Sequence, residues 1–311
     1  MIVDGYLLKE IISKDSSGYE YYLTYKSNNK FLTKKIVRKK LEENKDEFQF
    51  IKNEILMLND LSHRNIIKFK QIMKTKKFYY AIMEYCNGGT IKENLEKYIN
   101  KYGKPFSEKM AQYIIRQLFD VMKYLDYKKI TKYELFLEDI LLNYYTEEAK
   151  NNTDIFHSDL KLTNFRKARH NEKEKLGISI LIELGTVYKK DNKYKNIILN
   201  LFLFCYYLFT GDLSFKIIDE DDLMKKEIKL PINLSLEAIS FLFKILKNYT
   251  DNIKDFKELS NYPFLKKYFG DFVDIDIKDI SKFIKDEYLI FNINNINEIY
   301  KVIQTDDVDK I

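Results

Sequence analysis

Tryptophan is absent from the 311 residues, and cysteine, proline, histidine and glycine are scarce, with two, three, three and nine copies. Cys86 and Cys205 are too few for a disulfide-stapled fold and are typical of a reducing compartment, so we expect a cytoplasmic protein. A membrane span is not expected, because the richest apolar run, Ile197 to Phe209, is short and contains Asn200. The opening residues, MIVDGYLLKEIISKD, lack the basic start and long apolar core of a signal peptide.

Arginine is scarce as well, although the net charge is +6. Nucleic-acid surfaces favour the forked guanidinium group, whereas nearly all of the positive charge here is lysine, spread along the chain together with asparagine. An AT-rich genome explains this bias better than a nucleic-acid partner does, so we expect no such partner. The five arginines are Arg38, Arg64, Arg116, Arg166 and Arg169.

The hydrophobic pattern divides the chain into a strand-rich and a helix-rich part. In residues 1–85, strand patterns at 19–24, 31–37, 66–71 and 78–84 surround one helical pattern at 46–61. Beyond residue 90 the expected helices are 110–127, with Ser107 as N-cap, 197–209 and 236–248. We expect an inserted turn at 144–152, an exposed charged loop at 166–175, and helical fragments such as 280–288 in a polar tail.

The most informative segment, Tyr124 to Leu142, reads YLDYKKITKYELFLEDILL. It resembles the catalytic loop of protein kinases, YLHxxxIIHRDLKxENILL. Four further strings resemble the same family in the same order, namely LSHRNII at 61–67, YYAIMEYCNGG at 79–89, YLFTGDLSF at 207–215 and ELSNYPFLKKY at 258–268. The chain therefore resembles the eukaryotic protein kinase superfamily, of the serine/threonine type.

The resemblance implies an α+β, bilobal fold. A small β-rich N-lobe with helix αC would cover about residues 1–85, and a larger, mainly helical C-lobe about residues 86–268, within a kinase-like domain of residues 1–268. Residues 269–311 would form a C-terminal helical tail. ATP and Mg²⁺ are the cofactors that the family implies, and a protein is the implied substrate or partner.

The phosphate-covering loop is degenerate. The family pattern GxGxxGxV uses glycines so that backbone amides can approach the phosphates. Here SKDSSGYE keeps only Gly18, and Ser13 and Asp15 stand in place of the first two glycines. We expect a weakened grip on phosphate.

Other nucleotide-binding positions are retained. Lys34 matches the strand lysine that holds the α- and β-phosphates, and Glu54 matches its αC partner; alternation along the strand would turn Lys35 to the opposite face. The gatekeeper would be Met83. The hinge that meets adenine through its backbone would include Glu84 and Cys86.

The catalytic loop has lost several chemical groups. Lys132-Tyr133-Glu134 stands where the family has His-Arg-Asp, so Glu134 is a degenerate base whose extra methylene displaces the carboxylate. Phe136 replaces the lysine that neutralises the transferred phosphate. Asp139 replaces the metal-binding asparagine and could still hold Mg²⁺.

The metal motif, Asp-Phe-Gly in the family, is expected at Asp159-Leu160-Lys161. The metal carboxylates would then be Asp159 and Asp139. The activation segment would close at Glu183, and Asn252 would stand where an arginine usually pairs with that glutamate.

A second register is open. The string HSDLKLTNF at 157–165 matches the active catalytic loop, HRDLKxxNf, with Asp159 as base, Lys161 on phosphate and Asn164 on metal. This register leaves no activation segment, and residues 131–156 would be unexplained, so we prefer the first.

Three functions follow. The leading hypothesis is a pseudokinase that acts as an allosteric or scaffolding partner in signalling and retains the means to bind ATP. The alternatives are an active or weakly active serine/threonine kinase that transfers the ATP γ-phosphate to proteins, and an interaction module that binds no nucleotide.

Overall fold

The computed structural model describes residues 1–14, 18–131, 135–170, 193–217, 220–251, 256–266, 284–285 and 288–293. The chain forms two compact units. Unit 1 consists of residues 1–91, 120–132 and 138–176, and unit 2 of residues 92–119, 133–137 and 177–311. Unit 1 thus includes segments beyond residue 86, so this division differs from the single lobe boundary expected near residue 85.

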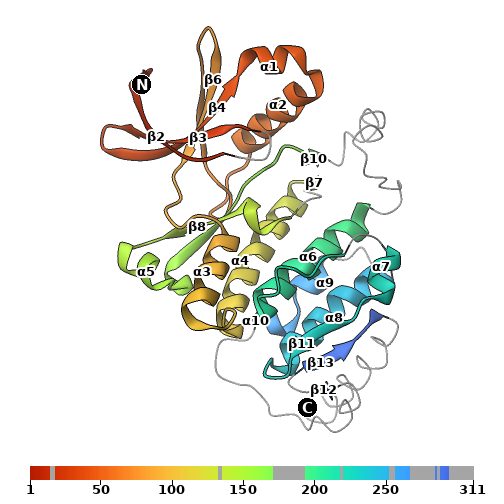
Figure 1. Ribbon diagram of the computed structural model, residues 1–311. Helices are drawn as coiled ribbons and strands as arrows, with labels where there is room; N and C mark the ends of the chain where they lie inside the picture. The colour runs from red at the N-terminus through yellow and green to blue at the C-terminus, as the bar shows by residue number, and fades with distance from the viewer. Residues whose placement is uncertain are drawn as a thin grey trace. The chain divides into compact units, whose positions relative to one another are not determined.

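Unit 1 contains an antiparallel sheet with the strand order β1–β2–β3–β4–β6–β5 (Figure 1). Its strands are β1 (Ile2–Val3), β2 (Tyr6–Lys14), β3 (Glu20–Lys26), β4 (Asn29–Val37), β5 (Phe69–Lys74) and β6 (Phe78–Glu84). Two helices, α1 (Arg38–Glu43) and α2 (Lys45–Asp60), follow β4. The Asn44 side chain caps α2 by accepting a hydrogen bond from the amide of Glu47 at 3.0 Å.

Both faces of this sheet are packed, as the alternation of β6 shows. Tyr80 and Ile82 lie in a core cluster with residues of β2 and β5. Ala81 belongs to a second cluster, which includes Ile36 of β4 and Ile51 of α2. The second cluster anchors α2 against the sheet, so side chains of α2 can reach residues of β4.

A two-stranded ladder completes the part of unit 1 that concerns the site. In this ladder β8 (Ile140–Tyr144) runs antiparallel to β9 (Ser158–Leu162), with Ile140 opposite Leu162 and Asn143 opposite Asp159. Helix α5 (Glu147–Asn152) lies between them in the chain, so the turn expected at 144–152 is in fact partly helical. The Thr146 hydroxyl explains this, because it caps α5 by accepting from the amide of Ala149 at 3.1 Å. A short pair, β7 (Ile130–Thr131) with β10 (Arg169–His170), and two 3₁₀ turns, Leu137–Asp139 and Ile155–His157, complete the connections.

Unit 2 is mainly helical. Its elements include α3 (Ile91–Tyr102), α4 (Glu108–Tyr127, which passes into unit 1 at residue 120), α6 (Lys193–Thr210), α7 (Glu220–Lys225), α8 (Leu236–Thr250), α9 (Phe256–Ser260) and α10 (Pro263–Lys266). The helices expected at 110–127, 197–209 and 236–248 are confirmed. Phe241 of α8 is fully buried, with its ring 5.1 Å from that of Phe264 and 5.7 Å from that of Phe119.

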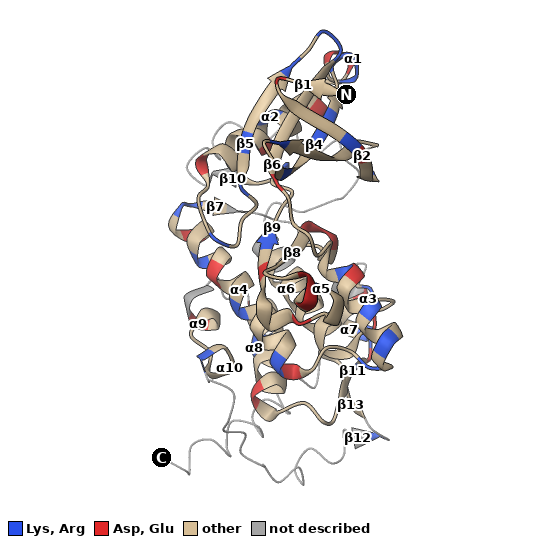
Figure 2. Cartoon of the chain, turned by 90° about the vertical axis from the view of Figure 1, so that its left-hand side faces the viewer, with Lys and Arg blue, Asp and Glu red and all other residues tan. Residues whose placement is uncertain are grey.

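Among the described helices, none combines the length and apolar character needed to cross a membrane. Basic and acidic residues share the same elements, as on α3, which carries both Lys and Glu (Figure 2). The expected absence of a nucleic-acid partner stays a prediction.

Of the tail expected to be helical at 269–311, only residues 284–285 and 288–293 are described, and their strands contradict the helical fragment expected at 280–288. These residues include two strands, β12 (Ile284–Lys285) and β13 (Tyr288–Phe291), and β13 pairs with β12 and with β11 (Ile228–Pro231). Leu289 and Phe291 are buried while Tyr288 is exposed, so the period of two, together with an available strand partner, outweighs the helical propensity.

Candidate functional site

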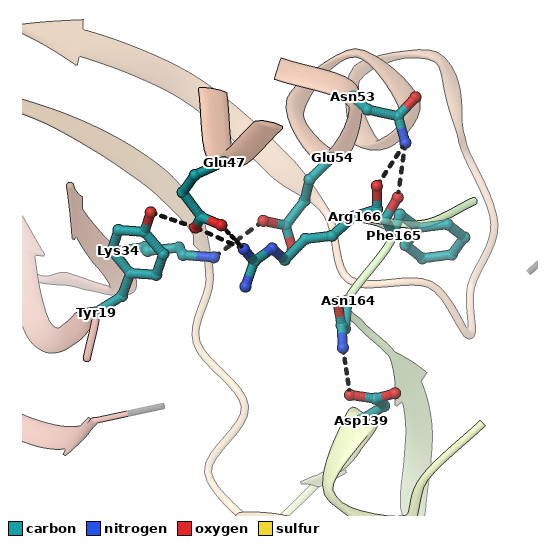
Figure 3. Close-up of polar contacts among 9 residues, drawn as sticks. All are labelled: Tyr19, Lys34, Glu47, Asn53, Glu54, Asp139, Asn164, Phe165 and Arg166. Carbon is teal, nitrogen blue, oxygen red and sulfur yellow. Dashed lines mark hydrogen bonds and ion pairs between the residues drawn. The ribbon is translucent and has the colours of Figure 1, made fainter. Parts of the chain in front are cut away.

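The lysine and glutamate predicted to pair do meet. Lys34 of β4 lies with its Nζ 3.0 Å from Oε2 of Glu54 on α2 (Figure 3). Burial is the largest single influence and lowers the pKa of Lys34, but the attraction of Glu54 and Tyr21 and the hydrogen bond to Glu54 together outweigh it, and the pKa is raised. Lys35 faces the other way and binds Glu20 of β3 at 3.1 Å, as alternation along the strand requires. The role of Lys34 toward a nucleotide stays a prediction.

The predicted hinge residues follow one another at the end of β6. Met83 and Cys86 are buried, and Glu84 is partly buried. The Glu84 carboxylate accepts from the amide of Lys68 at 2.9 Å and lies 3.0 Å from Nζ of Lys161. The cation of Lys161, expected either in the metal motif or on phosphate, is therefore held by the hinge instead.

Both cysteines are buried, and burial raises the pKa of Cys86 to about 12. The thiolate is the reactive form, so we expect the native protein to react with a disulfide reagent such as DTNB at pH 8 far more slowly than the unfolded chain. In the unfolded chain both cysteines should react at once. Absorbance at 412 nm with and without denaturant measures this. Rapid release of one equivalent from the native protein, absent in a Cys86→Ala variant, would contradict the burial of Cys86.

Asp139 and Asn164 form the polar pair below the Lys34–Glu54 ion pair in Figure 3. The Asn164 side-chain amide donates to Oδ1 of Asp139 at 2.8 Å, and the Thr163 amide donates to the Asp139 carbonyl, also at 2.8 Å. Asn164 has a φ of +57°, in the left-handed region that Asn and Asp tolerate better than other side chains. The turn after β9 thus presents the Asn164 side chain to Asp139.

This geometry corrects the predicted metal motif. Asp159 was expected beside Asp139, but it lies inside β9 opposite Asn143 and is held by Arg64 and by the Tyr145 hydroxyl, at 2.6 and 2.9 Å. In the family pattern, IKIsDFGLakF, the metal motif directly follows a strand, and β9 is the strand in that position. The residues that directly follow β9 lead to Asn164-Phe165-Arg166, so this triplet, and not 159–161, stands in the position of Asp-Phe-Gly.

The alternative register is also contradicted. It requires Asp159, Lys161 and Asn164 to gather in one loop, but the first two belong to a strand fully paired with β8. Their partners differ as well: Asp159 binds Arg64, Lys161 binds Glu84 and Asn164 binds Asp139. A strand ladder cannot also serve as the catalytic loop, because its backbone groups are already committed to pairing.

Of the catalytic-loop positions, Phe136 is described and Glu134 is not. Phe136 is 49% exposed and brings no cation to the place of the family lysine. Glu134, Asp15, Glu183 and Asn252 lie outside the described residues, so the predictions made for them stay untested.

The phosphate-covering loop is described at its two ends. Ser13 pairs with Tyr21 in the β2–β3 ladder. Gly18 has a φ of +79°, a conformation that glycine adopts without strain. The retained glycine therefore has a conformational role at this position.

Sequence reasoning missed a cluster built on Arg166. Its guanidinium donates to both carboxylate oxygens of Glu47 on α2, at 2.5 and 2.6 Å, and the Tyr19 hydroxyl donates to Glu47 at 2.5 Å (Figure 3). Asn53 of α2 donates to the carbonyls of Phe165, Arg166 and Ala168. Phe165 is fully buried. A usable signal existed, since LKLTNF places Phe directly after Asn at the end of a strand pattern, whereas Asp159 lies in its middle.

The residues in the metal position fit Mg²⁺ poorly. Mg²⁺ prefers carboxylate oxygens in an octahedral shell, usually one or two of them together with substrate phosphates and water. Asp139 supplies a carboxylate, but Asn164 turns its donor NH₂ group toward it. Across the ranges that the structure describes, no three acidic, histidine or cysteine side chains cluster as metal ligands. Among the described residues, Asp159 and Asp139 therefore do not form the predicted pair of metal carboxylates, since Asp159 binds Arg64 and Asp139 binds Asn164.

A cavity of about 310 Å³ lies away from these residues, on the α1–α2 side of unit 1. It is lined by Arg38, Leu41, Glu42, Lys45, Phe48, Gln49 and Tyr79. None of the predicted site residues lines it.

Comparison with known proteins agrees with the order of these elements. Residues 6–265 match the family model described as "Protein kinase domain". The chain is similar to the serine/threonine-protein kinase atg1 of Dictyostelium discoideum, at 24% identity over 277 residues that cover 85% of this chain and 39% of that protein. It is also similar to calcium-dependent protein kinase 27 of Arabidopsis thaliana, at 31% identity over 188 residues, 59% of this chain and 34% of that protein.

A third relative is serine/threonine-protein kinase 33 of Bos taurus, at 27% identity over 184 residues, 57% of this chain and 36% of that protein. The chain spans about two fifths or less of the length of these relatives. The likeness to them concerns the matched region.

Proposed function

From the premise that this chain belongs to the eukaryotic protein kinase superfamily, we propose that it is a pseudokinase, which acts by binding a partner protein and not by transferring phosphate. Members of the family bind ATP and Mg²⁺ and act on proteins. In this chain we expect binding to a protein partner to be retained and phosphate transfer to be lost. Two buried free thiols support a reducing compartment such as the cytoplasm as its place of action.

One observation carries the proposal, namely the exchange of a carboxylate and an amide at the metal position. The family places Asn in the catalytic loop and Asp in the metal motif, whereas this chain has Asp139 and Asn164. Phosphoryl transfer depends on charge neutralisation by metal and cations. An amide that donates to the remaining carboxylate satisfies that charge internally and leaves less of it for a metal.

The loss of the phosphate-neutralising cation supports the same conclusion. Phe136 occupies the place of the lysine, and a half-exposed aromatic ring contributes no charge. Two cations of the following segments are already paired with carboxylates, since Lys161 binds Glu84 and Arg166 binds Glu47. These features support a kinase fold with a weakened capacity for phosphate transfer.

An assay of phosphate transfer tests the proposal. We expect the purified chain, with radiolabelled ATP and either Mg²⁺ or Mn²⁺, to label neither itself nor generic protein substrates above the level of a Lys34→Met variant. That variant controls for contaminating kinases, because it removes the lysine predicted to hold phosphate. Incorporation that Lys34→Met abolishes would show an active kinase and overturn the proposal.

A further inference from the structure

The ammonium group of Lys34 is enclosed by the chain itself. Only 4% of its side chain is exposed. Besides Glu54, it faces the Tyr19 ring at 4.8 Å and the Tyr21 ring at 5.6 Å, measured from Nζ to the ring centroids. Aromatic faces stabilise a cation at such distances. The ammonium group that the family resemblance assigns to a nucleotide phosphate is thus enclosed by Glu54 and two tyrosine rings.

The enclosure is held by charged contacts from two other elements. Tyr19 follows Gly18 at the end of the phosphate-covering loop, and its hydroxyl is fixed on Glu47 of α2. Arg166 binds the same carboxylate, and its guanidinium lies 5.8 Å from the centroid of the Tyr19 ring. Burial and the Glu47 carboxylate raise the pKa of Tyr19, so its hydroxyl stays a donor at neutral pH.

We propose that Tyr19, Glu47 and Arg166 form a latch that closes over Lys34, excludes phosphate from it and holds α2 in its ion-paired position without a nucleotide. The three residues are called the latch below. Two cations and two carboxylates balance in this cluster, Lys34 with Glu54 and Arg166 with Glu47, so an incoming phosphate meets no uncompensated positive charge. To reach Lys34, it would have to displace the Tyr19 ring and break the hydrogen bond to Glu47.

Asn53 strengthens the latch from the side of Arg166. Its amide nitrogen lies 2.9–3.1 Å from three acceptors of the segment after β9, the carbonyls of residues 165, 166 and 168. These bonds hold the backbone that carries Arg166 against α2. The latch therefore joins Tyr19, which immediately precedes β3, to α2 and to the segment after β9 through side chains of the chain alone.

Lysine reactivity tests the latch directly. The protein would be treated with limiting acetic anhydride, and acetylation of Lys34 and Lys35 quantified by mass spectrometry in the wild type, Arg166→Gln, Tyr19→Val and Arg64→Gln. We expect Lys34 to be acetylated about 10-fold faster in the first two variants than in the wild type, because opening of the site sets the rate. Arg64→Gln removes an arginine outside the latch and should leave Lys34 unchanged.

Lys35 serves as an internal control, since it lies on the opposite face and should react equally in all four proteins if they are folded. Tyr19→Phe, which removes only the hydroxyl, gives a milder opening should either of the stronger variants fail to fold. A Lys34 rate that is the same in Arg166→Gln, Tyr19→Phe and Arg64→Gln would overturn the latch. This readout does not involve phosphate transfer, so the latch and the proposed function can fail separately.

Discussion

Replacing Glu54 with glutamine is expected to lower the free energy of unfolding by about 3–5 kcal/mol, because it leaves the Lys34 charge buried without its counter-ion. Lys34 and Glu54 side chains are 4% and 13% exposed, so water cannot replace the lost carboxylate. Glutamine keeps the size of the side chain and removes only its charge. Urea denaturation followed by circular dichroism measures the change.

Two matched variants separate the ion pair from other effects. Glu20→Gln breaks the neighbouring pair with Lys35, in which the Glu20 side chain is 26% exposed, and should cost about 1 kcal/mol or less. The double variant Lys34→Met/Glu54→Leu removes both charges and should recover most of the loss, since burying two apolar groups avoids the desolvation of the ions. An equal loss in the single and double variants would mean that packing around Glu54, and not the charge of Lys34, sets its contribution.

Restoring the family motif is expected to restore metal-dependent nucleotide binding. The triple variant Asp139→Asn/Asn164→Asp/Arg166→Gly returns the amide and carboxylate to their family positions and opens the latch. Asp tolerates the left-handed backbone at position 164, so the turn should persist. With ATP at about ten times its dissociation constant, we expect the melting temperature to rise by about 3 °C.

The control for this variant is Arg166→Gly alone. It opens the latch and leaves Asp139 and Asn164 in place, so ATP should raise its melting temperature equally with Mg²⁺ and with EDTA. In the triple variant EDTA should remove most of the shift, because the metal carboxylate now faces the phosphates. The same insensitivity to EDTA in both variants would show that the Asp139–Asn164 exchange does not govern metal binding.

The parts of the site that the sequence predicted correctly depend on a local period or on a position matched by the family resemblance. Strand alternation predicts that Lys34 and Lys35 point to opposite faces of the sheet. The Lys34–Glu54 pair follows from the positions that these two residues match in the kinase family. The helices at 110–127, 197–209 and 236–248 followed from their apolar spacing. Alternation and apolar spacing depend on neighbours within a few residues of the chain, whereas the Lys34–Glu54 pair, 20 residues apart, was predicted from the family resemblance.

The metal motif was misplaced because its position is set by pairing and not by local pattern. The string around Asp159 resembles both a metal motif and a catalytic loop, and these resemblances outweighed the strand pattern in which Asp159 lies. Because β9 pairs with β8 along its length, Asp159 belongs to a strand, and both interpretations of this string are wrong. The helical fragment expected at 280–288 was wrong for a similar reason, since β13 pairs with β11, a strand about 60 residues earlier in the chain.

Two features can be predicted from the sequence alone, namely a kinase-type order of strands and helices and the absence of a cation at Phe136. Both depend on residue identity and short-range spacing. Folding in three dimensions selected Asn164 to face Asp139, and Arg166 to bind Glu47 across 119 positions of chain. Contacts over such separations depend on strand register and on how α2 packs against its sheet. Those are properties of the assembled core that no short stretch of the chain contains.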